Sequence, residues 1–140
     1  MALKLFTIRP EPGNAATLAA VQALGFPIAG YPLFGVEPVA WSCPDAAEYD
    51  AILLGSANAL RHGGSAIAGL TGLPVYAVGK ATGKAAREAG FTVAQVGQGV
   101  LQGVIDHLAE QQAPGTPRRF LRLTGVDHVP VTLPDGMAVD

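Results

Sequence analysis

Short apolar runs alternate along this chain with polar stretches and with turns rich in glycine or proline. Apolar runs bounded by such turns are typical of buried strands, whereas apolar positions three and four residues apart favour helices. We expect Asn14 to cap the first helix, and Ser56 or Asn58 to cap a short helix that ends at Gly63. Gly90 is expected to end a further helix. The patterns predict strands over 3–8, 26–31, 51–54, 73–78, 91–96 and 120–123, helices over 15–24, 82–89 and 100–110, a turn over 80–82, and a further strand beginning at 137–139.

The order of these elements is strand, helix, strand over residues 1–31, followed by an extended stretch broken by Pro32 and Pro38. After that stretch, strands and helices alternate as far as residue 123. Strands joined through helices pair in parallel, and this alternation is typical of the α/β class. We therefore predict an α/β protein in which residues 31–38 cross from one structural unit to another.

Composition excludes several classes of protein. The 140 residues are 49% hydrophobic but only 14% charged, with a net charge of −2, against about 25% charged residues in typical domains. This low charge fits a surface that is buried against another chain or another part of a longer one. Nine basic residues scattered among eleven acidic ones give no nucleic-acid footprint. The absence of a long apolar run or a secretory leader predicts a cytoplasmic protein without a membrane span.

Polar residues gather in three turns that each follow a predicted strand, at 8–10, 55–58 and 78–82. Open α/β sheets bind ligands at the carboxyl ends of their strands. The third turn leads into a helix whose free N–H groups favour anions, and Lys80 and Lys84 add positive charge nearby. We therefore expect the three turns to line one cleft for an anionic ligand. Because Ser, Asn and Thr also serve as ordinary helix caps, that simpler interpretation stays open.

A second glycine-rich segment invites a nucleotide-binding interpretation. Gly97, Gly99 and Gly103 follow a predicted strand and open a helix. The last two glycines are one residue too far apart for the dinucleotide fingerprint, and no acidic residue ends the next strand. A nucleotide-binding α/β module therefore remains an alternative function.

The sequence offers no metal site and no recognisable nucleophile. His62, His107 and His128 lie far apart, without an i,i+4 partner or a neighbouring cysteine. Cys43 is the only cysteine, which excludes an internal disulfide and a thiolate cluster. Ser56 lacks the G-x-S-x-G elbow of serine hydrolases. We expect no metal, and the catalytic residues stay unknown.

Four segments occur in the order and spacing seen in uroporphyrinogen-III synthases. They are Arg9-Pro10 after the first strand, Leu53–Ala59 (LLGSANA), Val75–Thr82 (VYAVGKAT) and Ala89–Phe91 (AGF). The V-G-x-A-T turn followed by A-G-F is the most specific part. The chain resembles this family over its whole length, but it corresponds only to about the first half of the family.

The resemblance implies two α/β lobes joined by a two-stranded link, with the first lobe built from both ends of the chain. Residues 1–33 would be the opening β-α-β piece of lobe one with the crossing strand. Residues 34–140 would be most of lobe two, a parallel-sheet flavodoxin-like lobe whose carboxyl-terminal remainder is absent. Thr124-Gly125 stands where the family carries an Arg-Gly pair, and a family tyrosine has no counterpart. We expect such a fragment to be inactive alone and to dimerise or aggregate through unpaired apolar surface.

The resemblance also implies a reaction, the cyclisation of hydroxymethylbilane with inversion of its last pyrrole ring. This lyase reaction of haem and other tetrapyrrole (porphyrin) biosynthesis needs no cofactor. It runs through loss of water to an azafulvene and a spiro intermediate, so the protein's main task is to fold and shield a linear tetrapyrrole with many carboxylates. A non-catalytic tetrapyrrole- or anion-binding lobe is the alternative. The substrate-binding residues carried over from the family are Arg9, Ser56, Ala57, Asn58, Gly79, Lys80 and Thr82.

Overall fold

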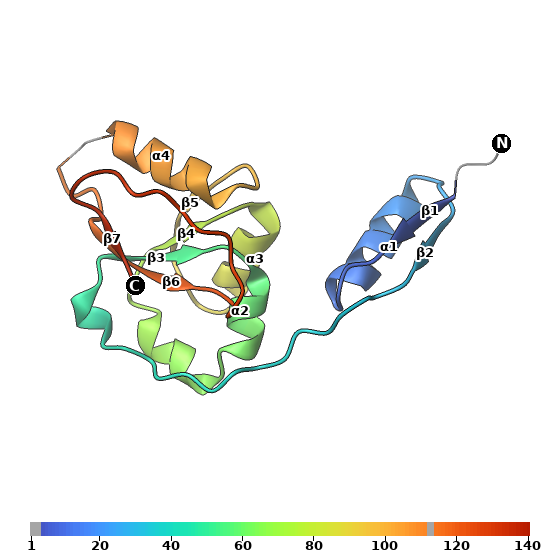
Figure 1. The fold of residues 1–140 in the computed structure, drawn as a ribbon, viewed down its shortest axis with the longest axis horizontal. Helices are drawn as coiled ribbons and strands as arrows, with labels where there is room; N and C mark the ends of the chain where they lie inside the picture. The colour runs from blue at the N-terminus through green and yellow to red at the C-terminus, as the bar shows by residue number, and fades with distance from the viewer. Residues whose placement is uncertain (1–3, 112–113) are drawn as a thin grey trace. The chain divides into compact units, whose positions relative to one another are not determined.

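The structure, a computed structural model, describes residues 4–111 and 114–140 (Figure 1). The chain divides into two compact units, Met1–Glu37 and Pro38–Asp140. The division falls within the proline-broken stretch that the sequence predicts as a crossing between units. None of the helices in the described part of the chain combines the length and the apolar character that a membrane span requires.

The smaller unit is a single β-α-β crossover. It contains β1 (Leu5–Thr7), α1 (Gly13–Ala23) and β2 (Ile28–Gly30). The two strands pair in parallel, with Phe6 opposite Ala29, as the sequence predicts. The strands are shorter than the apolar runs, because only these residues have a partner strand to pair with.

Asn14 does not cap α1, and that expectation was wrong. The N-cap position is Pro12, and Asn14 lies inside the first turn with its side chain buried. The carboxylate of Glu11 does the capping instead, because it accepts hydrogen bonds from the Ala15 N–H at 3.0 Å and from Asn14 Nδ2 at 2.9 Å. The hydrogen bond from Asn14, and to a smaller extent that from the Ala15 N–H, holds the pKa of Glu11 below its ordinary value.

The larger unit is an α/β layer structure. Its strands pair in the order β5-β4-β3-β6-β7, and every pair is parallel. This confirms the predicted flavodoxin-like α/β class, and the strand expected from residue 137 is β7. The elements are η1 (Ala46–Glu48), β3 (Ala51–Leu54), α2 (Ala57–His62), η2 (Ser65–Leu70), β4 (Val75–Ala77), α3 (Lys80–Glu88), β5 (Val93–Val96), α4 (Leu101–Gln111), β6 (Arg119–Leu123) and β7 (Ala138–Val139), where η marks a 3₁₀-helix.

The central strand β3 is covered on both faces, and all four of its residues are 0% exposed. Because side chains alternate along a strand, Ile52 and Leu54 face the layer of η2 and α3, whereas Leu53 faces α4. Figure 1 shows α4 on one side of the sheet and α2 and α3 on the other. The buried face of α4 is the predicted one, made of Leu101, Val104, Ile105 and Leu108.

Helix α3 begins two residues earlier than its sequence pattern indicates. Residues 80–82 form its first turn rather than a separate turn, and Gly79 is the N-cap in extended conformation. The Gly83 N–H donates to the Gly79 carbonyl at 2.9 Å, which closes that first turn. Gly90 follows the helix with a φ of +90°, which confirms its predicted place at the C′ position.

The segment after β6 returns along the α4 side of the sheet. Val131, Leu133 and Met137 pack against the buried cluster of α4 and β6. Its last residues form β7, which pairs with β6 through Ala138 opposite Arg119 and Val139 opposite Phe120. The segment therefore belongs to the fold of the larger unit.

Candidate functional site

The turns after β3, β4 and β5 lie side by side at one edge of the sheet. Leu54 and Ala77 are register partners in neighbouring parallel strands, so the turns that follow them start next to each other. The third turn is tied to the second, because the N–H groups of Gly97 and Gly99 donate to the carbonyls of Ala77 and Val78, both at 2.8 Å. We call residues 55–58, 78–82 and 97–100 together the carboxyl edge.

The residue composition of the carboxyl edge favours the binding of an anion. It contains no Asp, Glu or His, and it carries one lysine, Lys80. Lys80 is exposed and makes no ion pair with the residues that the structure describes. Lys84, expected to add charge here, pairs instead with Glu88 one helical turn away, at 3.7 Å. The local charge of the carboxyl edge therefore comes from Lys80 and from backbone N–H groups.

At the start of α2 one of the three predicted site residues serves as the helix cap. Ser56 is the N-cap, and its hydroxyl accepts a hydrogen bond from the Asn58 N–H at 3.2 Å. The side-chain oxygen of Asn58 accepts from Arg61 Nη1 at 2.8 Å. Ala57 is the first residue of the helix. The simpler interpretation of Ser56 as a helix cap therefore describes its contacts in this structure.

The start of α3 differs, because no side chain caps it. Gly79 at the N-cap has no side chain, and its nearest non-neighbouring backbone atoms belong to Gly99, 3.8 Å from where a Cβ would lie. Within the described part of the chain, the N–H groups of residues 80–82 have no side-chain acceptor. An exposed helix start with free N–H groups and a lysine at its first position can accept a carboxylate.

Thr82 lies at the third position of α3 and is 7% exposed. Its hydroxyl has no hydrogen-bond partner among residues 4–111 and 114–140. The Thr82 oxygen is not among the buried side-chain atoms that lack a partner, so the hydroxyl keeps contact with solvent. It is therefore open to solvent beside the uncapped helix start.

Arg9 belongs to the smaller unit. Its guanidinium lies against the start of α1, where Nη1 donates to Thr17 Oγ1 at 2.8 Å and Nη2 lies 3.1 Å from where a Cβ of Gly13 would be. The other six predicted site residues belong to the larger unit. The structure therefore brings together the turns at 55–58 and 78–82, and it places Arg9 beside its own helix.

Arg122 is a polar residue at this end of the sheet that sequence reasoning missed. It lies in β6 opposite Leu53, and its Nη2 donates to the Val129 carbonyl at 2.7 Å. Its Nε is buried without a partner among the described residues, and burial lowers the pKa of the guanidinium. The signal was a charged residue inside an otherwise apolar strand, FLRL.

The glycines at 97 and 99 do not form a dinucleotide cradle. Both N–H groups are used in bonds to carbonyls of the β4 segment, so they cannot hold a pyrophosphate in this conformation. Among the described residues, no three His, Cys, Asp or Glu side chains gather in a way that could hold a metal ion.

The parallel sheet, with an uncapped helix start at its carboxyl edge, defines an α/β protein of the flavodoxin-like class. A family model described as "Uroporphyrinogen-III synthase HemD" matches residues 15–136. No curated protein matches the chain. The match spans most of the sequence, and the chain belongs to the uroporphyrinogen-III synthase family.

Proposed function

We propose that this protein is a uroporphyrinogen-III synthase, which cyclises hydroxymethylbilane with inversion of the last pyrrole ring. The observation that carries the proposal is the start of α3. There the family-like segment V-G-K-A-T places an uncapped helix start, Lys80 and the hydroxyl of Thr82 in one turn. Family membership supports a role in tetrapyrrole biosynthesis.

In this proposal the carboxyl edge binds carboxylates of the linear tetrapyrrole. The N–H groups at the start of α3 and the ammonium of Lys80 hold one carboxylate, and the Thr82 hydroxyl donates to the substrate. Ser56, Ala57 and Asn58 line the neighbouring turn, and Arg9 is a further proposed substrate-binding residue. Water leaves the hydroxymethyl carbon to give the azafulvene, and the bound conformation favours the spiro intermediate over head-to-tail closure.

We also propose the organisation and setting that the sequence predicts. Residues 1–33 and 34–140 belong to two lobes, and the structural division after Glu37 supports that organisation. The reaction is a lyase reaction without a cofactor, and it takes place in the cytoplasm. The 140-residue chain alone is expected to be inactive.

The alternative is a lobe that binds tetrapyrroles or other anions without catalysis. It is favoured by the sequence of the carboxyl edge, which contains no Asp, Glu or His that could act as a general acid. Under this alternative the same residues bind the ligand, but no product forms.

Product analysis distinguishes the two functions. Freshly made hydroxymethylbilane is incubated with the 140-residue chain and with protein from the uninterrupted reading frame, and the type I and type III uroporphyrin isomers are separated after oxidation. Type III from either sample supports the synthase, and type III from the longer sample alone supports the inactivity of the 140 residues. Type I only from both, as in a protein-free blank, would leave the binding lobe.

We further propose that the 140-residue chain self-associates through the smaller unit. Phe6, in β1, is 67% exposed, and Ile8 and Tyr31, which directly follow β1 and β2, are exposed as well. We call these three residues the bare apolar face. Contiguous apolar surface of this kind favours association with another protein surface.

A further inference from the structure

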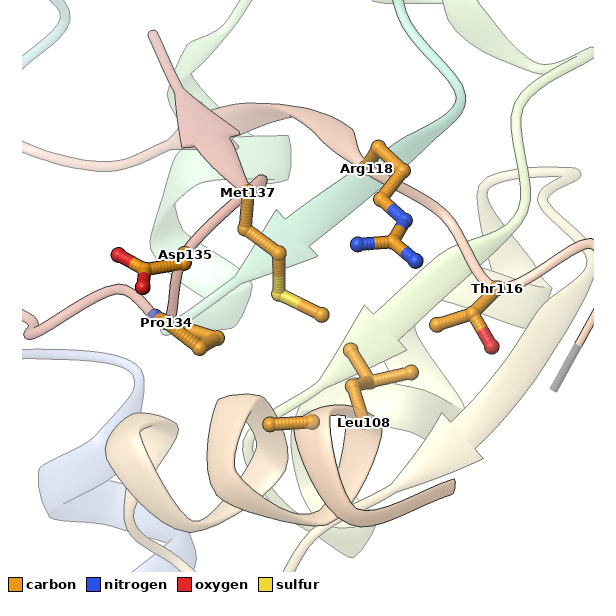
Figure 2. A pocket seen from close by; sticks show the side chains of 7 residues that line it. Leu108, Thr116, Arg118, Pro134, Asp135 and Met137 are labelled. Carbon is orange, nitrogen blue, oxygen red and sulfur yellow. The ribbon is translucent and has the colours of Figure 1, made fainter. Parts of the chain in front are cut away.

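A cavity of about 360 Å³ lies at the edge of the five-stranded sheet opposite the carboxyl edge (Figure 2). Arg118 immediately precedes β6 and Met137 immediately precedes β7, so both lie at the amino-terminal ends of parallel strands. Leu108, in the last turns of α4, forms the opposite wall. The cavity is therefore separated from the candidate tetrapyrrole site by the length of the strands.

The walls of the cavity combine the cation of Arg118 and apolar side chains with two further polar residues, Thr116 and Asp135. Figure 2 shows the side chains of Arg118 and Met137 reaching toward Leu108, with Thr116 beside them and the carboxylate of Asp135 turned away. The Arg118 guanidinium makes no hydrogen bond or ion pair with the described residues, although its backbone N–H donates to Asp50. A guanidinium with unused donors next to apolar side chains can bind a carboxylate in a bidentate manner.

The backbone leaves room for this guanidinium at Gly136. A Cβ at that position would lie 3.1 Å from Arg118 Nη1, and the φ of +81° is one that side-chain-bearing residues rarely adopt. A larger residue at 136 would therefore crowd the guanidinium. The glycine makes the position of Arg118 compatible with the turn that leads into β7.

We propose that this cavity binds a small monocarboxylate with a short apolar chain. The carboxylate binds to Arg118, and the chain packs against Leu108, Pro134 and Met137. The volume is at the lower end of the roughly 300–1,000 Å³ of ligand pockets, which suits a small molecule. Asp135 also lines the cavity, so a ligand with one carboxylate fits better than the polycarboxylate of the proposed reaction.

Methionine methyl groups give a direct test, because the sequence contains only Met1 and Met137. The chain is labelled with ¹³C-methyl methionine, and the signal of Met137 is assigned as the one that Met137→Leu removes. Hexanoate is then titrated to millimolar concentration, and hexan-1-ol serves as the uncharged probe of the same chain length. We expect a saturable shift of the Met137 signal with hexanoate and binding about tenfold weaker with hexan-1-ol.

Variants of Arg118 test the role of its charge. Arg118→Gln should weaken hexanoate binding about tenfold, Arg118→Lys should keep most of it, and Arg87→Gln on α3 should leave it unchanged. An unmoved Met137 signal would overturn the proposal. So would equal binding of hexanoate by the parent chain and a folded Arg118→Gln variant. Because the readout uses no tetrapyrrole, it is independent of the proposed function.

Discussion

Gln102 and Thr132 are joined by two reciprocal hydrogen bonds. Gln102 Nε2 donates to the Thr132 carbonyl at 2.9 Å, and the Thr132 N–H donates to Gln102 Oε1 at 2.8 Å. The side-chain amide of Gln102 thus acts as a backbone partner for a segment that has no strand beside it at that point. These bonds join the first turns of α4 to the segment between β6 and β7.

The Gln102–Thr132 pair predicts a local effect of Gln102→Ala. We expect the free energy of unfolding to fall by about 1–2 kcal/mol, because two hydrogen bonds are lost at the surface. Amide exchange at Thr132 should become much faster, while exchange in β3 changes only with global stability. Gln111→Ala at the exposed end of the same helix is the control. Unchanged exchange at Thr132 would contradict the role given to Gln102.

Acid stability should depend on Asp50. Its carboxylate accepts the N–H groups of Arg119 and Arg118, both at 2.9 Å, and these bonds hold its pKa below the ordinary value. A carboxyl whose pKa is lowered in the folded state stabilises the protein above its unfolded pKa, near 4. This contribution is lost as the pH falls through the folded pKa.

Asp50→Asn should therefore lower the free energy of unfolding by about 1 kcal/mol at pH 7. The difference from the parent chain should shrink as the pH is lowered below about 4. Urea unfolding at a series of pH values measures both effects, with Asp127→Asn at an exposed turn as the control. A difference between parent and variant that stays constant with pH would show that the carboxylate charge is not involved.

Alanine substitutions at two glycines of the β5–α4 region should change the stability of the protein in opposite directions. A Cβ at Gly97 would lie 2.6 Å from Val104 Cγ2 and 2.9 Å from the Val78 carbonyl oxygen, whereas a Cβ at Gly103 would meet nothing within 4 Å. Gly97→Ala should lower stability by about 1–3 kcal/mol through overpacking. Gly103→Ala should raise stability by about 0.5–1 kcal/mol, since alanine is the better helix former.

Thermal or urea unfolding of both variants provides the measurement, and each variant is the control for the other. A neutral Gly97→Ala would mean that the turn after β5 can move away from α4. A destabilising Gly103→Ala would mean that this face of α4 is covered in solution.

Thr82→Val should separate ligand binding from folding. The substitution removes a hydroxyl that has no partner among the described residues, so stability should change by less than about 1 kcal/mol. Binding of uroporphyrin III to the 140-residue chain, followed by fluorescence quenching, should fall at least about tenfold, and so should formation of type III product by protein from the uninterrupted reading frame. Thr92→Val, at the exposed residue just before β5, is the control. A variant that binds as well as the parent chain would exclude Thr82 from the site.

The bare apolar face predicts the association state. The 140-residue chain should form dimers or larger species in light scattering, and Phe6→Glu should shift it toward monomer, because a charge there opposes burial of the face. Gln22→Glu on the exposed part of α1 adds the same charge elsewhere and should leave the mass unchanged. A parent chain that is monomeric at every concentration would contradict the prediction.

The sequence predicted the sheet well, because its signals are local. The apolar run of β3 lies between Asp50 and Gly55, and the apolar positions of α4 repeat with helical spacing. The sequence therefore predicted both elements together with their buried residues. The start of α3 was missed because its N-cap is a glycine, which carries no capping side chain to recognise. Helix η2 was missed because SAIAGL has neither helical periodicity nor a cap.

The candidate site was predictable only in part. Parallel neighbours place their following turns together, so the nearness of 55–58 to 78–82 follows from element order. The contacts of single residues do not follow from it. Ser56 bonds to its own helix, and the Arg122 guanidinium bonds to the Val129 carbonyl in the segment that follows β6. The cavity at Arg118 likewise depends on the position of residues 134–137, and no local sequence pattern predicts that position.

The complete burial of β3 has a consequence for how this protein can change over time. Its four inaccessible residues are under packing constraint, whereas the turn that follows them holds an exposed serine and leads into a short helix. Substitutions at the exposed positions 80 and 81 can therefore be sampled with little risk to folding, whereas Ser56 also caps α2. A fold arranged in this way can acquire a new ligand preference by drift in its turns while the inherited scaffold stays intact.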